Sequence, residues 1–281
     1  MFELRWERPL HQRPAAADIA VSDGDVLVHE RSTRLVRLSG SDGAVRWDVP
    51  LGTWPRAVVL DGSDVVALPQ QPGRLFCLSW ADGLPHWTND VGWLSGHVVV
   101  SPEVVLVGGW RGYTPLRGLS RSTGELLWTR SRVTVLPAWF AGGFLVGEPR
   151  GAGAELLHPG TGEPTRTWRT HVPNADAEPV SEVIDESHAL VSGQPLNSGS
   201  RRTRPSVPRP TSGERLAGSL ALPGTEITVT LDRAGHLEHW SPDGTRLGRV
   251  RVARRAEGLR VLGPDRIVVA AKGTIAVYGV G

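Results

Sequence analysis

The chain has 281 residues, 40% of them hydrophobic, and it is rich in glycine (34) and proline (22). This composition excludes a disordered chain and favours many short strands with tight turns over long helices. The formal net charge is only +2, whereas a nucleic-acid-binding protein usually has a larger and clustered excess of basic residues. We therefore do not expect a nucleic-acid partner.

The single cysteine, Cys77, excludes an intramolecular disulfide bond. The first residues lack the basic and apolar regions of a signal peptide. No apolar run approaches the roughly 20 residues of a membrane helix. We therefore expect a cytoplasmic protein with no membrane partner.

The first element along the chain is a predicted strand over residues 2–10. Its sequence Leu4-Arg-Trp6-Glu-Arg-Pro-Leu10 matches Val45-Arg-Trp47-Asp-Val-Pro-Leu51 almost residue for residue. Seven apolar, mostly β-branched runs follow, each suited to a buried strand. They cover residues 26–28, 65–68, 104–107, 144–146, 189–191, 227–229 and 267–269.

A turn dipeptide ending in glycine follows each of the first six runs, after a short apolar segment. The dipeptides are Asp42-Gly43, Asp82-Gly83, Thr123-Gly124, Thr161-Gly162, Ser212-Gly213 and Asp243-Gly244. Glycine accepts the positive φ that a tight hairpin turn requires. The pattern therefore predicts repeated β-hairpins.

Five tryptophans recur at steps of 41, 40, 41 and 40 residues: Trp6, Trp47, Trp87, Trp128 and Trp168. A step of this length is typical of a four-stranded propeller blade. We expect these five rings to be structural and to pack between adjacent blades, where each sheet buries both faces.

The two ends of the chain complement each other. Residues 2–10 resemble an outermost strand with no inner strands before it, whereas the run at 267–269 and the segment 274–278 are followed by the end of the sequence. We expect the N-terminal strand to complete the last blade, since this removes exposed sheet edges. The prediction is an all-β chain, 1–281, forming a single β-propeller domain of seven four-stranded blades.

The segments Gly73-Arg-Leu-Phe-Cys-Leu78 and Ser122-Thr-Gly-Glu-Leu-Leu-Trp128 resemble the pyrroloquinoline-quinone-like (PQQ-like) propeller repeat, which is also similar to WD40 repeats. The resemblance covers most of the chain and implies a propeller. The quinone enzymes of this family imply eight blades, a cysteine pair and calcium-binding carboxylates. This sequence has one cysteine and about half the expected length, so the resemblance favours the non-enzymatic branch, with no cofactor and no metal.

The repeat becomes irregular after about residue 190. The spacing of the turn glycines changes to 51 and then 31 residues, so we expect an insert in the fifth blade and a compressed sixth blade. Residues 194–210 are polar, basic and proline-rich, which predicts a flexible insert.

A second set of aromatic and polar residues is not explained by blade packing. We expect these residues on the loops at one face of the propeller, the top face. They are Trp54, Arg56, Trp93, His97, Trp110, Arg111, Tyr113, Trp139 and Asp176. Exposed aromatic rings beside arginine and histidine are typical of a binding surface. The alternative is that the rings plug the central channel or brace neighbouring loops.

No nucleophile elbow, phosphate-binding loop or metal-spaced histidine cluster is present in the sequence, so we predict no catalytic residues. We expect a non-catalytic, monomeric interaction propeller that docks another protein through its top face. The alternative function is a small-molecule binder or enzyme at the channel mouth.

Overall fold

The computed structural model describes residues 2–10, 19–30, 34–131, 134–147, 154–168, 181–185, 188–191, 194–195 and 216–281. Within these ranges the chain consists of β-strands and one short 3-10 turn, with no helix able to cross a membrane. By its internal contacts the chain divides into two compact units, Met1–Leu60 with Arg204–Gly281, and Asp61–Thr203. Each unit is described by itself.

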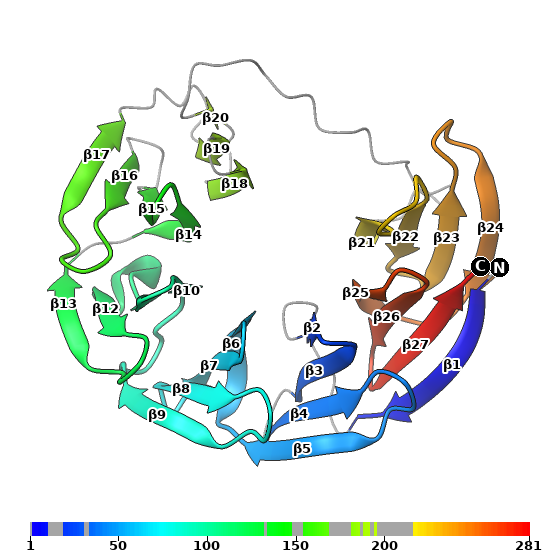
Figure 1. Ribbon diagram of the computed structural model, residues 1–281, viewed down its shortest axis with the longest axis horizontal. Coiled ribbons are helices and arrows are strands. Elements are labelled where there is room, and N and C mark those ends of the chain that lie inside the picture. Colours follow the sequence, from blue (N-terminus) through cyan, green and yellow to red (C-terminus); the bar gives the residue numbers. More distant parts are fainter. Residues whose placement is uncertain are drawn as a thin grey trace. The chain divides into compact units, whose positions relative to one another are not determined.

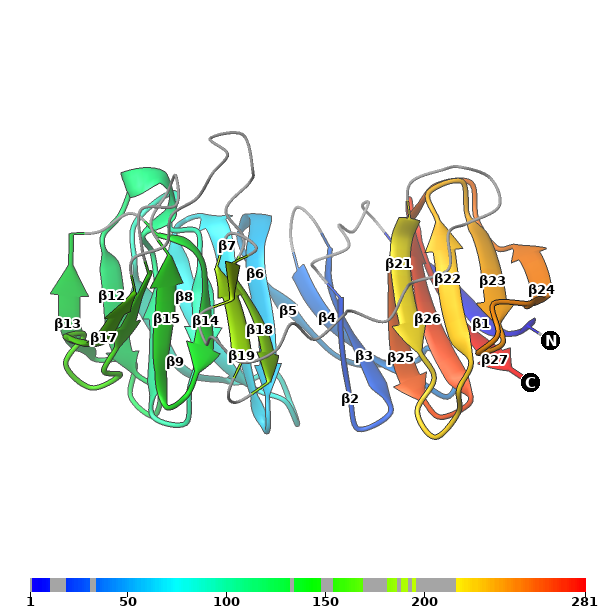
Figure 2. The ribbon, with the colours of Figure 1, turned by 90° about the horizontal axis from the view of Figure 1, so that it is seen from above.

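The first unit holds three four-stranded antiparallel sheets, which we call blades 1, 6 and 7. Blade 1 is β2 (Ile19–Ser22), β3 (Asp25–Glu30), β4 (Arg34–Ser39) and β5 (Val45–Pro50). Blade 6 is β21 (Leu216–Ala221), β22 (Thr228–Asp232), β23 (His236–Trp240) and β24 (Arg246–Arg251), side by side in Figure 2. Blade 7 is β25 (Ala256–Gly263), β26 (Arg266–Ala271), β27 (Thr274–Val280) and β1 (Phe2–Pro9).

The N-terminal strand completes the last blade, as the sequence predicts. Strand β1 pairs antiparallel with β27, from Phe2 opposite Val280 to Pro9 opposite Thr274. The two ends of the chain therefore lie next to each other (Figure 1). This pairing covers the edge of β27 that would otherwise expose unpaired backbone groups.

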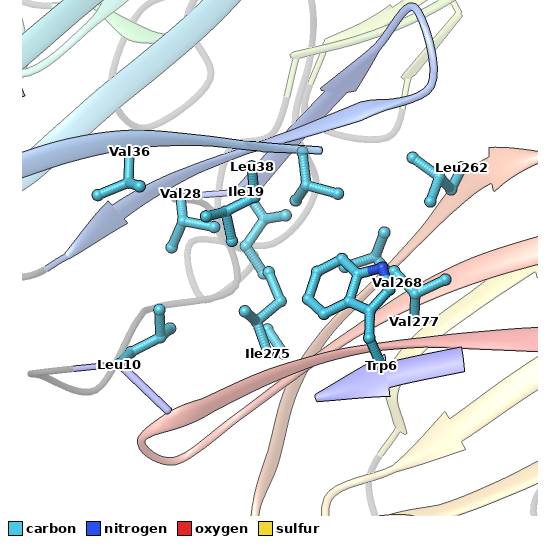
Figure 3. Packing of buried hydrophobic residues seen from close by; sticks show 12 residues of the cluster. Trp6, Leu10, Ile19, Val28, Val36, Leu38, Leu262, Val268, Ile275 and Val277 are labelled. Carbon is cyan, nitrogen blue, oxygen red and sulfur yellow. The ribbon is translucent and has the colours of Figure 1, made fainter. Parts of the chain in front are cut away.

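A hydrophobic cluster joins blade 7 to blade 1. Trp6 of β1 packs there with Val268 and Val277 of blade 7 and with Val28 and Leu38 of blade 1 (Figure 3). The Trp6 Nε1 donates a hydrogen bond to the carbonyl of Gly40 (3.0 Å), so the indole is both buried and satisfied.

The second unit holds the rest of the described blades. Blade 2 is β6 (Thr53–Asp61), which belongs to the first unit except for Asp61, β7 (Asp64–Gln71), β8 (Arg74–Ser79) and β9 (Pro85–Asp90). Blade 3 is β10 (Val98–Val100), β11 (Val104–Val107), β12 (Leu116–Ser120) and β13 (Leu126–Arg130). Blade 4 is β14 (Val135–Phe140), β15 (Gly143–Gly147), β16 (Ala154–Leu157) and β17 (Pro164–Trp168).

Blade 5 has three strands within the described residues: β18 (Ser181–Asp185), β19 (His188–Val191) and β20 (Gln194–Pro195). The predicted insert over 194–210 begins in β20, and its residues 196–210 lie outside the described ranges. The described sheets thus number seven, six of them with four strands, which agrees with the predicted blade count.

Three tryptophans of the repeat, Trp6, Trp87 and Trp128, lie against a turn glycine of the next blade. The Trp87 Nε1 donates to the carbonyl of Arg121 (2.7 Å), and the Trp128 Nε1 donates to the carbonyl of Pro159 (2.6 Å). Each accepting carbonyl lies in the hairpin turn of the next blade. Trp47 is buried as well, and Trp168 is half-buried beside the guanidinium of Arg166.

Blade 6 lacks the repeat tryptophan, and another ring takes its place. Gly248 stands on β24 opposite His239 of β23, and the His239 imidazole lies where a Cβ on Gly248 would extend. The imidazole is buried and its centroid is 5.0 Å from that of Phe2 of blade 7. The aromatic ring between these two blades therefore comes from the neighbouring strand.

Candidate functional site

Two adjoining loops of the second unit carry most of the predicted site residues. Residues 91–97 connect β9 to β10, and residues 108–115 connect β11 to β12. The Gly108 N–H donates to the His97 carbonyl (3.2 Å). The Ser95 hydroxyl donates to the Val91 carbonyl (2.7 Å) and shares a hydrogen bond with Thr114 Oγ1 (3.2 Å). Ser95 and Thr114 are buried, so these bonds fix the two loops to each other.

The second loop bends through several left-handed residues. Gly108, Gly109, Arg111 and Gly112 have φ of 98°, 74°, 51° and 75°. The three glycines adopt this backbone without strain, whereas Arg111 is a side-chain-bearing residue held in it. The Thr134 N–H donates to the Gly109 carbonyl (2.9 Å) and anchors the bend from the start of blade 4.

The bend places three side chains together. The Trp110 and Tyr113 rings have centroids 5.5 Å apart, and the Arg111 guanidinium carbon lies 4.8 Å from the Trp110 ring centroid. Trp110 also packs on the first loop, because a Cβ on Gly96 would come within 2.4 Å of the Trp110 Cβ. The glycine at position 96 is therefore what allows the Trp110 ring to approach.

The outer surface of the two loops exposes two large rings. Trp93 is 57% exposed and Tyr113 is 56% exposed, whereas Trp110 is half-buried and Arg111 is exposed. We call Trp93, Trp110, Arg111 and Tyr113 the aromatic loop patch. The structure places all four of these predicted site residues on the two loops, and their role in binding stays a prediction.

His97 has a supporting position in the first loop. It is half-buried, and its Nε2 lies 3.2 Å from the Thr134 carbonyl, with which it shares a hydrogen bond. Burial lowers the pKa of His97, and the hydrogen bond to Thr134 partly opposes this shift. A neutral imidazole donating to a backbone carbonyl braces the loop against blade 4.

The expected loop location is wrong for two tryptophans. Trp139 lies in strand β14, where its ring meets Phe144 edge-on at a centroid distance of 5.4 Å and packs on the core of blades 3 and 4. Trp54 lies in strand β6, as does the half-buried Arg56. In both blades the inner strand begins closer to the preceding tryptophan than expected. Asp176 lies outside the described residues.

Sequence reasoning missed the residues that hold the patch in place. Serine and threonine are not among the residue types associated with binding surfaces, so the sequence does not single out these positions. Ser95, Thr114 and Thr134 are all buried and form hydrogen bonds beneath the two loops. The run Gly108-Gly109 followed by Gly112 is the signal that predicts an unusual backbone there.

A separate cavity of about 690 Å³ lies at the hairpin turns of blades 2 and 3, lined among others by Asp64, Cys77, His86, Glu103 and Arg121. The Arg121 guanidinium bonds to Asp64 Oδ2 (2.9 Å) and to Asp61 Oδ2 (2.6 Å). Burial raises the pKa of the Cys77 thiol to about 11, so the thiol stays protonated at neutral pH.

The histidines that stand three apart in β23 make separate contacts. His236 Nδ1 lies 3.0 Å from Asp232 Oδ2, while His239 packs on Phe2. Across the residues that the structure describes, no three His, Cys, Asp or Glu side chains are grouped as metal ligands would be. The His236 and His239 side chains therefore do not come together as a pair of metal ligands.

No protein-family model and no curated protein matches the chain. Among solved structures, it is similar to BamB from Moraxella catarrhalis, with 17% identity, a TM-score of 0.68 and coverage of 99% of this chain and 98% of that one. The WD40 domain of Neurospora crassa Pan2 is 11% identical with a TM-score of 0.64, over 99% and 95% of the two chains. The computationally designed protein Ika8 is 14% identical with a TM-score of 0.52, over 97% and 98%. At these identities the likeness concerns the fold, and together with the seven described sheets it shows that this chain is a β-propeller.

Proposed function

We propose that this propeller is a non-catalytic interaction module that docks another protein through the aromatic loop patch. The observation that carries the proposal is the exposure of Trp93 and Tyr113 on loops held by buried hydrogen bonds. Tryptophan, tyrosine and arginine dominate the binding energy of protein interfaces. Exposed rings of this size on two adjoining loops favour a binding role over a structural one.

The rigidity of the two loops also favours docking. The hydrogen bonds of Ser95 and the bond from Thr134 to Gly109 hold the backbone in one conformation before any partner arrives. A surface that is already ordered loses less conformational entropy on binding. Affinity therefore depends on burying the rings of Trp93 and Tyr113 rather than on ordering the loops.

The test compares ring-removing variants with a matched control. Purified Trp93→Ala and Tyr113→Ala proteins are used as bait in the native host extract, and a partner retained by the wild type is identified and purified. Each variant is then titrated with that partner. Loss of a central interface ring costs about 2 kcal/mol or more, so we expect binding at least about 30-fold weaker.

Leu84 provides the control, because it is 64% exposed but lies in the hairpin turn of blade 2. Leu84→Ala removes an exposed apolar side chain without touching the patch, and we expect unchanged affinity. We also expect a photo-crosslinker placed at position 113 to form a covalent crosslink to the partner. Equal affinity of the wild type, Trp93→Ala and Tyr113→Ala would contradict the proposal.

We also propose that the blades are of the PQQ-like, non-enzymatic type and form one domain. Support comes from the recurring arrangement in which the ring of Trp6, Trp87 or Trp128 lies against a turn glycine of the next blade. The proposed working state is a cytoplasmic monomer. Sedimentation of the purified protein and fractionation of host cells test these two properties.

A further inference from the structure

Three segments of the first unit meet beside blades 6 and 7. The Val252 N–H donates to the Gly235 carbonyl (2.8 Å), which joins the loop after β24 to the β22–β23 turn. The Lys272 N–H donates to the Arg255 carbonyl (2.9 Å), which joins the same loop to the β26–β27 turn. Backbone hydrogen bonds therefore fix the loop after β24 to the two turns.

These segments surround a cavity of about 450 Å³ that is lined by cations. Arg254, Arg255 and Lys272 line it together with Thr274 and Glu7. Lys272 is the only lysine of the chain. All three cationic side chains are exposed, and none forms an ion pair with any carboxylate among the described residues.

Many other arginines of this unit differ from these three side chains, because they do form ion pairs. Carboxylate partners hold many of them: Arg34 bonds to Glu30, Arg37 to Asp25, and both Arg246 and Arg249 approach the buried Glu238. Two further exposed arginines, Arg233 and Arg251, lie in the segments that border the cavity and likewise have no carboxylate partner among the described residues. Five cationic side chains without a carboxylate partner among the described residues therefore lie in the segments around the cavity.

We propose that this cavity binds a phosphate group. Like charges held close together repel each other, and a bound dianion removes that repulsion. Guanidinium groups match the geometry of phosphate oxygens with paired N–H donors, and a lysine ammonium adds a compact charge. The Thr274 hydroxyl, which also lines the cavity, is a further donor for a phosphate oxygen.

The size of the cavity and the charge of the chain favour a compact phosphate over a nucleic-acid backbone. A duplex needs a basic surface that follows many phosphates, whereas this chain has a net charge of +2. The Glu7 carboxylate at the cavity also limits the number of phosphates that it accepts. The group comes either from a free phosphate compound or from a phosphorylated side chain of a protein, and the chemistry of recognition is the same.

The test titrates the full-length protein with pyrophosphate by calorimetry. A hydrogen bond to a charged group is worth about 1.5–3 kcal/mol, so we expect Lys272→Gln and Arg255→Gln each to weaken binding by about tenfold or more. Glu7→Gln removes a repelling carboxylate, and we expect it to tighten binding by about threefold. A misfolded variant would bind pyrophosphate more weakly, so tighter binding by Glu7→Gln cannot be an effect of misfolding.

Arg5→Gln is the matched control, because Arg5 is an exposed arginine of β1 that pairs with Glu3 and lies outside the cavity lining. It lowers the net charge by the same amount as Arg255→Gln, and we expect unchanged affinity. A phosphoserine peptide and its unphosphorylated twin distinguish the two sources of the phosphate. Absence of pyrophosphate and phosphopeptide binding, an equal loss in Arg5→Gln, or tighter binding of duplex DNA than of pyrophosphate would each overturn the proposal.

Discussion

The indole ring of Trp87 lies against Gly124 of the next blade: a Cβ on Gly124 would come within 2.5 Å of the ring carbon Cε3. The same turn is held by two hydrogen bonds, from Trp87 Nε1 to the Arg121 carbonyl (2.7 Å) and from Asn89 Nδ2 to the Gly124 carbonyl (2.8 Å). Trp128 and Arg130 make the same pair of bonds to Pro159 and Gly162 in the next turn. Blades of this unit are therefore joined by a repeated contact between a ring and a glycine.

Replacing that glycine is expected to loosen the junction. Gly124→Ala puts a Cβ both into the Trp87 ring and onto a backbone with φ of 74°. Left-handed backbone costs an L-residue about 1–2 kcal/mol, and overpacking adds about 1–3 kcal/mol. We expect the free energy of unfolding, measured in urea, to fall by about 2–5 kcal/mol.

Gly142→Ala separates the two contributions. Gly142 has φ of 78°, but no atom lies within 4 Å of the position of its Cβ. Its substitution is expected to cost only the backbone contribution of about 1–2 kcal/mol. Equal losses in the two variants would show that the Trp87 ring does not constrain position 124.

The fold was predictable because its signals repeat in the sequence. Trp6, Trp47 and Trp87 stand one blade apart, and a turn glycine precedes both Trp47 and Trp87 at the same distance. The match of the Trp6 and Trp47 segments also predicted the pairing of β1 with β27. Such repeats make strand order readable, since each hairpin has the same register.

The parts that were not predictable depend on contacts between strands. In blade 6 the aromatic ring belongs to His239 of β23, and Gly248 stands opposite it on β24. Only the register of these two strands reveals this arrangement. Trp93 and Trp139 both follow a repeat tryptophan, yet one is exposed on a loop and the other packs on Phe144. Sequence spacing does not indicate where an inner strand begins, and a bulge in β14 between Val135 and Ala138 shifts its register.

The ion pairs of Arg121 are expected to stabilise the second unit. Its guanidinium bonds to Asp61, to Asp64 and to the Ser101 carbonyl (3.2 Å), and it is only 18% exposed. Removing one partner of a largely buried pair leaves carboxylates without compensation. Arg121→Met is expected to lower the free energy of unfolding by about 2–3 kcal/mol, since Asp61 is partly solvated.

Arg74→Met is the comparison for that measurement. Arg74 bonds to Asp90 (2.8 Å), but the two side chains are 46% and 74% exposed. Exposed pairs are worth about 0–1 kcal/mol, so little change is expected. A loss in Arg74→Met as large as in Arg121→Met would contradict this assignment.

Acid is expected to destabilise the protein through His97. Burial lowers the folded-state pKa of His97 below 6.5, the value for a solvated imidazole. Between these two pKa values the unfolded chain binds more protons, so the free energy of unfolding falls as the pH decreases below about 6.5. Urea titrations between pH 7.5 and pH 5 (about the range of imidazole titration) measure this slope. His97→Gln is expected to reduce the slope, and an identical slope in the variant would contradict the role of His97.

Cys77 is expected to be unreactive in the folded protein. Its side chain is 1% exposed, and burial, assisted by the nearby Asp64 carboxylate, raises the pKa of the thiol to about 11 although Arg121 opposes the shift. Alkylation requires the thiolate, and a pKa near 11 reduces the thiolate fraction at mildly alkaline pH roughly a hundredfold relative to a free cysteine.

Iodoacetamide labelling followed by mass spectrometry measures the rate without ambiguity, because the chain has a single cysteine. We expect slow labelling of the native protein and rapid labelling in guanidinium chloride. Rates within a few-fold of each other would mean that the cavity beside Asp64 and Arg121 opens readily, and the stabilising role assigned to Arg121 would then be wrong as well.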